Sequence, residues 1–242
     1  MLEVLYEDPE LIAVQKPSGL LVHRTALAPR DRSVVLQALR DQRGERLYPV
    51  HRLDRATSGL LLLARSAPAH ARWSQCFAER QVAKSYLALI RGWLPDAGTI
   101  DYPLAAPGRD RASARSALTE FTTLGRVELP VRVDRYPTSR YALMQLSAHT
   151  GRTHQLRRHL NHVSHPIIGD TSYGQGRHNR FFRERFASQR LLLAAVELTL
   201  APPGATVRVL TAPLASEFWA VLVAIGLGAA VPERWRPSAR PL

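Results

Sequence analysis

The apolar run from Leu60 to Ala64 constrains the fold of this chain more than any other stretch. It directly follows a triplet that favours a turn, Thr57, Ser58 and Gly59. The run shows no alternation of polar and apolar residues, which is typical of a strand buried on both faces. We therefore expect a strand in the interior of a sheet that is covered on both sides.

The remaining predicted elements mix strands and helices. A turn at Asp8 and Pro9 separates two short apolar runs, which predicts a pair of strands. Pro68 favours the start of a helix, Pro166 is expected to end another, and the apolar segment 215–225 predicts a C-terminal helix. Further strands are predicted at residues 83–92, 117–124, 140–148 and 191–200. Because the elements do not alternate regularly as βαβ units, the predicted class is α+β.

The length and composition bound the kind of protein. A chain of 242 residues with 45% hydrophobic residues can bury a core as one large domain or two small ones. Cys76 is the only cysteine, so an intramolecular disulfide is impossible, which fits a reducing cytoplasm. The longest apolar stretch, 218–231, is shorter than the roughly 20 residues that cross a bilayer. We expect a soluble, cytoplasmic protein without a membrane partner.

The charge points to a polyanionic partner. The formal net charge is +13, and Lys16 and Lys84 are the only lysines, so nearly all of the positive charge is arginine. A charge excess of this size attracts nucleic acid, and arginine binds phosphate and stacks on bases. Arginine-rich usage can also follow genome composition, which would explain the choice of residue but not the net charge.

Several kinds of chemistry lack their motifs. No glycine-lysine pair of a P-loop occurs, and Ser18 and Ser58 do not form a nucleophile elbow. GLGAAV near the C-terminus is only half of a dinucleotide fingerprint. Four histidines at 154, 159, 162 and 165 raise a metal question, but lining a basic groove or packing at a helix end explains them better. We therefore expect neither a metal nor a cofactor.

Helical geometry separates two neighbouring arginines. Leu156, Leu160 and Val163 fall at i, i+4 and i+7, the apolar stripe of an amphipathic helix. At about 100° per residue, Arg157 lies beside this stripe and Arg158 lies roughly opposite it. Arg157 is therefore expected to reach a partly buried partner, whereas Arg158 faces solvent or a ligand.

Asp54 is the strongest catalytic candidate. It lies between Arg52 and Arg55, and guanidinium groups keep a partly buried carboxylate ionised at neutral pH. An aspartate flanked by arginines is more often a plain salt bridge that ties a loop to a helix. The longer string around Asp54 favours a catalytic role.

That string resembles the central motif of the RluA-type pseudouridine synthases. Their pattern is HRLD, two variable residues, TSG and an apolar strand, and this chain reads HRLDRATSGLLLLA. Other blocks agree in order along nearly the whole chain: KPSG at 16–19, KSYLALIRG at 84–92, and TGRTHQLRRHL followed by HPIIGD at 150–170. The resemblance implies a central mixed, largely antiparallel sheet, flanked by helices and loops, with an RNA-binding cleft.

The resemblance also implies roles for individual residues. Asp54 matches the catalytic aspartate, Tyr86 the tyrosine that stacks on the target base, and Arg157 the arginine that pairs with the aspartate. Arg52 matches the arginine that fills the gap left by the flipped nucleotide. The candidate RNA-binding residues are Lys16, Arg52, Arg152, His154 and Arg158; for Lys16 a turn-capping role is the stronger alternative.

The physics of the reaction fits these residue types. Breaking a glycosidic bond builds positive charge on the sugar, which a carboxylate stabilises or traps covalently. A base inside structured RNA has to be flipped out, which needs an aromatic stacking surface and a wedge. Tyr86 and Arg52 are chemically suited to these two tasks.

Within the family, the chain most resembles the branch that modifies uridine 65 of tRNA. Ala194 stands where the family has a histidine, and the segment between Leu104 and Leu118 is shorter than in relatives. We expect one catalytic domain over 1–242 without an N-terminal S4 domain, a loose tail at 232–242, and a monomer. Alternatives are ribosomal RNA or both RNAs as substrate, a non-catalytic RNA-binding module, and a nucleoside hydrolase. A hydrolase would need a second acid, which this motif lacks.

Overall fold

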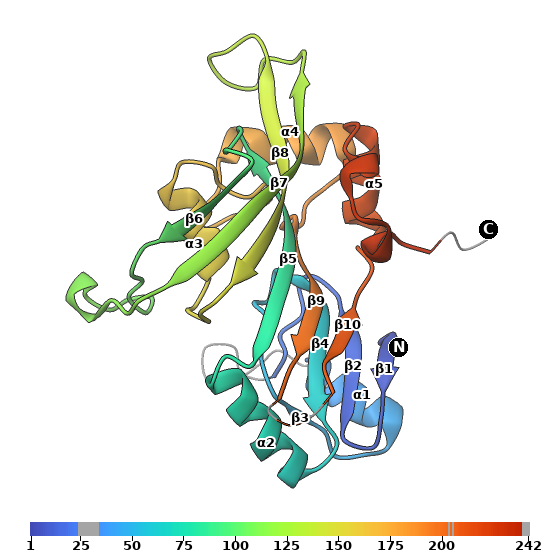
Figure 1. Cartoon of the computed structure of the whole chain (residues 1–242). Coiled ribbons are helices and arrows are strands. Elements are labelled where there is room, and N and C mark those ends of the chain that lie inside the picture. The colour runs from blue at the N-terminus through green and yellow to red at the C-terminus, as the bar shows by residue number, and fades with distance from the viewer. Residues whose placement is uncertain (24–33, 203, 205, 239–242) are drawn as a thin grey trace. The chain divides into compact units, whose positions relative to one another are not determined.

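The computed structural model describes residues 1–23, 34–202, 204 and 206–238 (Figure 1). Strands and helices are mixed along the chain, which confirms the α+β class. The chain divides into two compact units. Unit 1 comprises Met1–Ala83 and Ala195–Ala212, and unit 2 comprises Lys84–Ala194 and Pro213–Leu242. Among the described residues, no helix is long and apolar enough to cross a membrane.

Unit 1 is built on a sheet in which β1, β2, β4 and β9 are successive neighbours, with β3 paired to β4 and β10 to β9. The strands are β1 Val4–Glu7, β2 Leu11–Lys16, β3 Tyr48–Pro49, β4 Ser58–Ala64, β9 Leu193–Leu200 and β10 Arg208–Thr211. The helices of this unit are α1 Val35–Arg43 and α2 Ala67–Ala78. The pairs β1–β2, β2–β4, β3–β4 and β9–β10 are antiparallel.

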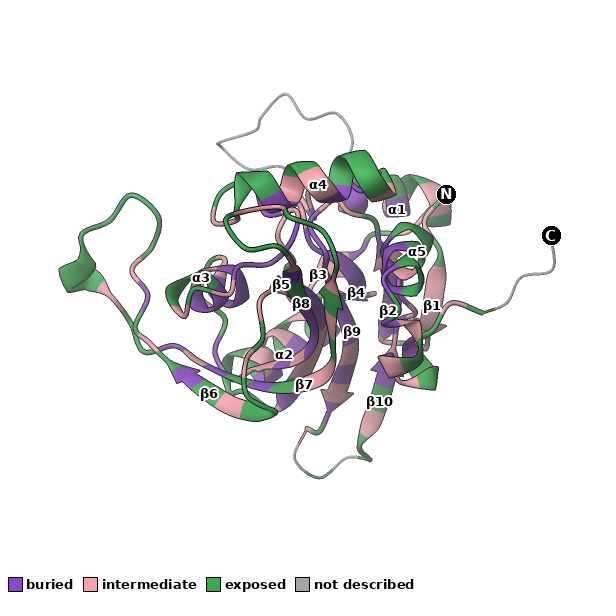
Figure 2. Ribbon diagram, turned by 90° about the horizontal axis from the view of Figure 1, so that it is seen from above, coloured by how far each residue is buried: buried purple, intermediate pink, exposed green. Residues whose placement is uncertain are grey.

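The predicted interior strand is β4. All seven of its residues are buried, and Figure 2 shows the strand in the colour of buried residues. It pairs with β2 from Leu11 opposite Ala64 to Lys16 opposite Gly59. On one side, Leu60 and Leu62 join a core cluster that includes Trp73 of α2, which confirms the helix predicted after Pro68.

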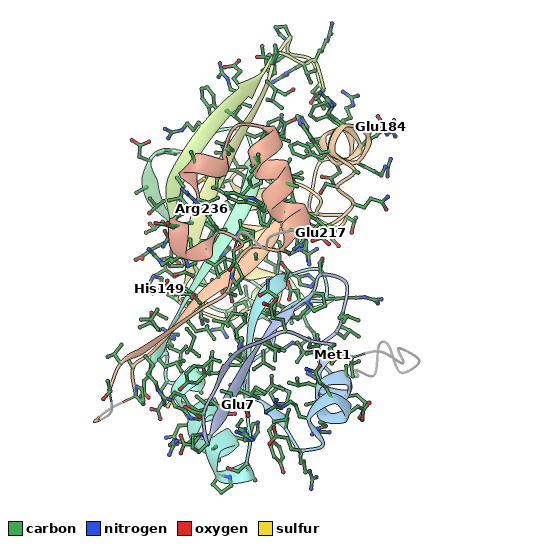
Figure 3. The ribbon with its side chains drawn as sticks, turned by 90° about the vertical axis from the view of Figure 1, so that its right-hand side faces the viewer. Met1, Glu7, His149, Glu184, Glu217 and Arg236 are labelled. Carbon is green, nitrogen blue, oxygen red and sulfur yellow. The ribbon has the colours of Figure 1, made fainter. Side chains whose placement is uncertain are left out.

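Ion pairs connect the ends of several elements at the surface of unit 1. Glu7, labelled in Figure 3, accepts from Arg43 Nη2 at 2.5 Å and lies 3.0 Å from Arg65 Nη1. Arg65 also pairs with Glu45 at 3.1 Å. These exposed or half-exposed pairs join the end of β1 to the ends of α1 and β4, and each contributes little to stability by itself.

Unit 2 contains the antiparallel strands β5, β8, β7 and β6, in that order of neighbours. The strands are β5 Val82–Arg91, β6 Ala97–Asp101, β7 Leu118–Leu129 and β8 Ser139–Ala148. The α-helices are α3 Gln155–His162, α4 Gly176–Phe186 and α5 Ser216–Ala224. Three short 3-10 helices are η1 Arg111–Ser113, η2 Gly228–Ala230 and η3 Glu233–Trp235. The antiparallel pairs in both units confirm the predicted largely antiparallel sheet.

Two predicted boundaries differ from the structure. The helix after Gly151 ends at His162 rather than at Pro166, because Ser164 has a left-handed backbone conformation with φ of 64°. The strand predicted at 117–124 continues to Leu129, past a register shift between Thr123 and Gly125.

The segment that we expected to be a loose tail begins as packed structure. Trp235 of η3 is completely buried, and its carbonyl accepts from the backbone N–H of Leu214 at 2.8 Å. Burial of a side chain as large as an indole keeps this part of the chain in place. Residues 239–242 of the expected tail lie outside the described residues.

Candidate active site

Asp54 lies in the short loop between β3 and β4. The loop contains a turn in which Thr57 N–H donates to the Asp54 carbonyl at 3.1 Å. Thr57 and Ser58 are buried, while Asp54 is half-buried. The carboxylate is therefore positioned by the first residues of a completely buried strand, as the motif predicts.

The KPSG segment, Lys16–Gly19, fixes this loop from the outside. Ser18 Oγ donates to the Ala56 carbonyl at 2.6 Å, and Gly19 N–H donates to the Arg55 carbonyl at 2.8 Å. Arg55 returns the contact, because its Nε donates to the Gly19 carbonyl at 2.9 Å. Arg55, which had no role in the sequence interpretation, thus ties two of the motif blocks together.

Lys16 has a structural position rather than an RNA-facing one. Its side chain is completely buried, and its Nζ donates to the carbonyls of Pro17 at 2.8 Å and Arg55 at 3.1 Å. A buried ammonium group is tolerated when its hydrogen bonds are satisfied. Since no part of this side chain reaches the surface, this position favours the alternative role of holding the turn over an RNA contact.

The two residues that open the HRLD block have different surroundings, since His51 is half-buried and Arg52 is exposed. His51 Nε2 accepts from the Leu62 backbone N–H at 3.0 Å, and its ring stacks on Phe77 at 4.8 Å. This contact satisfies a backbone donor of β4 that would otherwise need another partner. Arg52 is exposed and makes no hydrogen bond or ion pair with any other described residue. Its guanidinium is available to a ligand, as the predicted role requires.

Gly59 explains the glycine of the TSG triplet. Its φ is +107°, and a Cβ atom at this position would lie 2.0 Å from the carbonyl oxygen of Ala195. No side chain fits in that space, so β4 can approach β9 this closely only with glycine at this position.

Tyr86 is on β5, opposite Leu146 of β8. Its side chain is half-buried, and the residues that follow it from Leu87 to Ile90 are buried. The tyrosine thus emerges from a well-packed strand, which is a rigid position for a ring that stacks on a base.

Arg157 lies on the buried side of α3, as the helical geometry predicts, with 6% of its surface exposed. It forms a bidentate ion pair with Asp170, with Nε to Oδ2 at 2.7 Å and Nη2 to Oδ1 at 2.8 Å. Asp170 is 2% exposed and also accepts from the backbone N–H groups of Ser172 at 2.9 Å and Tyr173 at 3.0 Å. Four donors therefore converge on one buried carboxylate.

The pKa of Asp170 follows from this geometry. Burial raises the pKa, but the hydrogen bonds from Arg157 and from the backbone N–H groups of Tyr173 and Ser172 outweigh burial and leave the pKa below its ordinary value. Asp170 is therefore an ionised residue that fixes Arg157. The sequence interpretation missed it, although its HPIIGD block was one of the family signals.

A buried polar network attaches α3 to β7. Gln155 Nε2 donates to the Leu118 carbonyl at 2.9 Å and to Thr119 Oγ1 at 3.0 Å. Its Oε1 accepts from Thr150 Oγ1 at 2.6 Å. His159 Nε2 lies 3.0 Å from the Tyr102 carbonyl, which only accepts, so Nε2 carries the proton and Nδ1 accepts from Thr119 Oγ1 at 2.9 Å.

This network places α3 and its arginine firmly against the sheet. His159 is completely buried, and burial lowers its pKa, which favours the neutral tautomer that the network requires. Thr150, Gln155 and His159 all belong to the block TGRTHQLRRHL. Much of that block is therefore framework for Arg157.

The other predicted RNA-binding residues lie next to α3. Arg152 Nε donates to the Ser116 carbonyl at 3.1 Å, and Arg158 Nη1 donates to the Ala105 carbonyl at 2.7 Å. His154 Nδ1 lies 3.0 Å from Tyr173 Oη. All three candidates, Arg152, His154 and Arg158, are partly exposed, so each has surface left for a ligand.

The histidines of the possible metal cluster have protein partners. His162 stacks on Tyr102 with ring centroids 3.6 Å apart, and His165 Nδ1 donates to the Arg91 carbonyl at 2.9 Å. Within the described ranges, no three or more histidine, cysteine, aspartate or glutamate residues are grouped as metal ligands.

The structure thus groups the predicted residues within each unit. Lys16, Arg52 and Asp54 lie around one loop of unit 1, and Arg152, His154, Arg157 and Arg158 lie on or before α3 of unit 2. Tyr86 is on β5, whose residues from Lys84 onward also belong to unit 2.

Comparison with known families shows which family the chain with these sequence blocks belongs to. The family model described as RNA pseudouridylate synthase matches residues 10–162, which is more than half of the chain. The chain belongs to this family. The synthase is therefore an isomerase that acts on RNA, and the matched range contains Asp54, Tyr86 and Arg157.

Relatives and solved structures agree. The tRNA pseudouridine synthase C of Vibrio cholerae is 45% identical to this synthase over 211 residues, covering 84% of this chain and 86% of the relative. The protein of the same name from Haemophilus ducreyi is 41% identical over 228 residues, covering 91% of this chain and 94% of the relative. Human RNA Pseudouridylate Synthase Domain Containing 4 superposes with a TM-score of 0.72 at 25% identity, covering 93% of each chain.

Proposed function

We propose that this synthase converts uridine 65 of tRNA to pseudouridine. The observation that carries the proposal is the Asp54 loop, in which a half-buried carboxylate stands at the start of a buried strand within the complete family motif. The tRNA substrate is supported by relatives named tRNA pseudouridine synthase C, which align with at least 84% of this chain. Position 65 is carried by the resemblance to that branch.

The reaction is an isomerisation. The N1–C1′ bond of the uridine breaks, the freed uracil turns, a C5–C1′ bond forms, and the proton on C5 is lost while N1 gains one. Asp54 either attacks C1′ or assists a glycal route, and in both routes its carboxylate has to be ionised. Because the atoms of substrate and product are the same, the reaction itself needs no metal and no nucleotide cofactor.

The other residues serve the flipped nucleotide. Tyr86 stacks on the base and helps with the C5 proton, and Arg52, whose guanidinium is exposed, fills the vacated place in the RNA. For Arg157 the resemblance implies a pairing with the catalytic aspartate, and the bidentate ion pair with Asp170 fixes its guanidinium. The pairing of Arg157 with Asp54 stays a prediction that the two motif blocks support. Arg152, His154 and Arg158 bind the RNA backbone.

We also propose that both units act together as one catalytic domain, and that the protein works as a cytoplasmic monomer. The order of the blocks supports the first proposal, because the family model spans residues from both units. The high positive charge, which opposes self-association, supports the second.

The decisive variant is Asp54→Asn, which keeps the shape of the side chain and removes its charge. We expect tRNA binding within about twofold of the wild type and no detectable pseudouridine, because an amide neither attacks C1′ nor stabilises the sugar cation. Asp41→Asn, an exposed aspartate on α1, is the matched control and should retain full activity. Pseudouridine formation by Asp54→Asn would overturn the assignment, and release of free uracil by the wild type would favour a hydrolase.

The RNA target needs a separate experiment. Pseudouridine mapping in cells that lack this gene should show loss at position 65 of tRNA and an unchanged ribosomal RNA profile. Loss at a ribosomal site would support the alternative in which ribosomal RNA, or both RNAs, are substrates.

A further inference from the structure

Unit 2 contains a pocket of about 580 Å³ that none of the assigned residues lines. Its lining residues belong to the end of β5, the connection between β7 and β8, the start of β8, the segment after α3, and α4. The pocket is lined by Arg91, Gly92, Asp134, Tyr136, Pro137, Thr138, Ser139, Arg140, His165 and His178. Residues 136–140 of this lining belong to the block RYPTSR at 135–140, which the proposed reaction does not use.

Gly92 lets a histidine ring pack against the backbone at the wall of the pocket. Its φ is +81°, and a Cβ atom would lie 2.6 Å from His165 Nδ1. The His165 ring can therefore take this position only because residue 92 has no side chain.

Arg91 is a cation of this pocket with unused hydrogen-bond donors. Its Nε donates to His178 Nε2 at 3.3 Å, and its two Nη atoms make no hydrogen bond with any other described residue. His178 is 3% exposed, and its Nδ1 is 2.9 Å from Tyr141 Oη. Burial, and then the charge of Arg91, lowers the pKa of His178 to about 4, so a neutral imidazole orients the guanidinium.

The nearby acids are already occupied by other arginines. Asp134 pairs with Arg177 at 2.5 Å, and Glu128 pairs with Arg140 at 3.1 Å. Burial raises the pKa of Asp134, but the hydrogen bond and charge of Arg177, a backbone hydrogen bond from Arg135 and the charge of Arg91 outweigh burial and leave the pKa below its ordinary value. Each carboxylate thus has its own hydrogen-bonded arginine partner, and Arg91 adds a further positive charge near Asp134.

An aromatic ring lines the same pocket as this positive charge. Tyr136 lines the pocket, is 54% exposed, and has the Arg135 guanidinium 4.7 Å from its ring centroid. Half-exposed tyrosine and arginine side chains of this kind offer a face on which a nucleic-acid base stacks. The arginine guanidinium can bind a phosphate group and the tyrosine ring can stack on a base. These are two parts of a single nucleotide.

We propose that this pocket binds one nucleotide of the RNA substrate, with its phosphate on Arg91 and its base against Tyr136. The inference rests on the proposed function, because it takes RNA as the partner. Arg91 follows Tyr86 by five residues, which is about 17 Å along an extended strand. The bound nucleotide is therefore not the one that stacks on Tyr86, and the pocket is an accessory contact that positions the RNA.

The test compares Arg91→Gln and Tyr136→Ala with the wild-type protein, using full-length tRNA. We expect about tenfold weaker tRNA binding for Arg91→Gln, with the slope of log affinity against log salt reduced by about one. The rate of pseudouridine formation at saturating tRNA should stay unchanged, because neither side chain touches the reacting uridine. Arg91→Lys, which retains the charge, should recover part of the affinity. Tyr136→Ala changes only an exposed ring, so the test does not depend on whether Arg91→Gln folds.

The matched control is Arg185→Gln, which removes one exposed arginine from α4 outside the pocket. If Arg185→Gln weakens binding as much as Arg91→Gln, the effect is general electrostatics and the pocket proposal is wrong. Unchanged affinity and salt slope in both Arg91→Gln and Tyr136→Ala would also overturn it. Binding is measured separately from catalysis, so a wild-type protein that binds tRNA but forms no pseudouridine contradicts the proposed function and not the pocket.

Titration with uridine monophosphate and with inorganic phosphate separates the two sources of the phosphate group. We expect neither to bind below millimolar concentration, since a single nucleotide lacks the rest of the RNA. Micromolar binding of the free nucleotide that Arg91→Gln removes, with tRNA affinity unchanged, would mean a small-molecule site and would contradict an RNA contact.

Discussion

At the scale of single residues, the buried pair of Arg157 and Asp170 is the feature on which the site depends. Both side chains are almost completely removed from solvent, and their two hydrogen bonds are 2.7 and 2.8 Å long. Replacing a whole buried pair is often harmless, whereas removing one partner leaves the other charge buried without compensation. Asp170 therefore holds Arg157 in position and also determines the energetic cost of a change at either residue.

We expect Asp170→Asn to lower the free energy of unfolding by about 3 kcal/mol, because the amide removes the buried negative charge that accepts two hydrogen bonds from the Arg157 guanidinium. Urea denaturation at pH 7 measures this loss. Asp96→Asn, which removes an exposed partner of Arg126, is the control and should cost less than about 1 kcal/mol. Equal losses in the two variants would show that the buried Arg157–Asp170 pair contributes no more to stability than the exposed Arg126–Asp96 pair.

The same residues show how far sequence reasoning reaches. The position of Arg157 on the buried side of its helix followed from the spacing of Leu156 and Leu160. Asp170 was not predictable in this way, because it lies 13 residues from Arg157 in a loop without periodicity. An RNA contact of Lys16 was a reasonable expectation, since lysine is normally exposed. Its amine is satisfied by a carbonyl 39 residues away, a contact that local sequence does not reveal.

At the scale of elements, β4 is central because of how closely its first residues approach β9. The strand was predicted from four consecutive leucines, and its preceding TSG was interpreted as a turn. In the structure, Ser58 and Gly59 already belong to the strand, and Gly59 provides the space for the Ala195 carbonyl. The glycine of the motif thus serves strand packing as well as the turn.

We expect Gly59→Ala to be the most destabilising glycine-to-alanine substitution in unit 1. It should lower the free energy of unfolding by more than about 3 kcal/mol or prevent folding. The added Cβ would overlap backbone atoms, which cannot move aside as a flexible side chain can. Gly44→Ala is the matched control, because Gly44 has a φ of +67° but no neighbouring atom within 4 Å of the position that a Cβ would take. It should cost only about 1 kcal/mol. Thermal unfolding of both variants shows whether the loss of stability comes from steric overlap or from backbone strain. Similar losses of stability in the two variants would exclude steric overlap as the cause.

The elements that sequence patterns missed are those with few buried side chains. In α1 and α4 only two positions each are buried, Val35 and Leu39 in the first and His178 and Phe182 in the second. One or two buried residues do not create an apolar stripe that a periodicity search detects. Strands β6 and β10 have a single buried residue each, for the same reason. Long, strongly apolar elements such as β4, β9 and α5 were predicted with nearly correct bounds.

At the scale of the whole molecule, the net positive charge and the buried neutral histidines both lower the stability of the fold when the pH falls. The net charge is +13 before any histidine is protonated. Burial lowers the pKa of His159, and it lowers the pKa of His178 to about 4. The unfolded chain binds a proton at each of these positions near pH 6.5, whereas the folded protein does not.

Stability should therefore be complete above about pH 6.5 and should fall as the pH decreases toward 4. For His178 the loss is at most about 1.4 kcal/mol for each pH unit. Urea unfolding at pH 7, 6 and 5 checks this, and His178→Asn should show a smaller decrease than the wild type. A decrease in His178→Asn as steep as in the wild type would contradict the assignment.

The buried amine of Lys16 also has a chemical consequence. Acylating reagents modify lysine only when the amine is accessible, and Lys84 is the one other lysine in the chain. In the folded protein Lys84 is half-buried, whereas Lys16 is completely buried and reacts only when the KPSG segment separates from the Asp54 loop. The rate of acylation at Lys16 therefore measures how often that loop opens, with Lys84 as the internal reference.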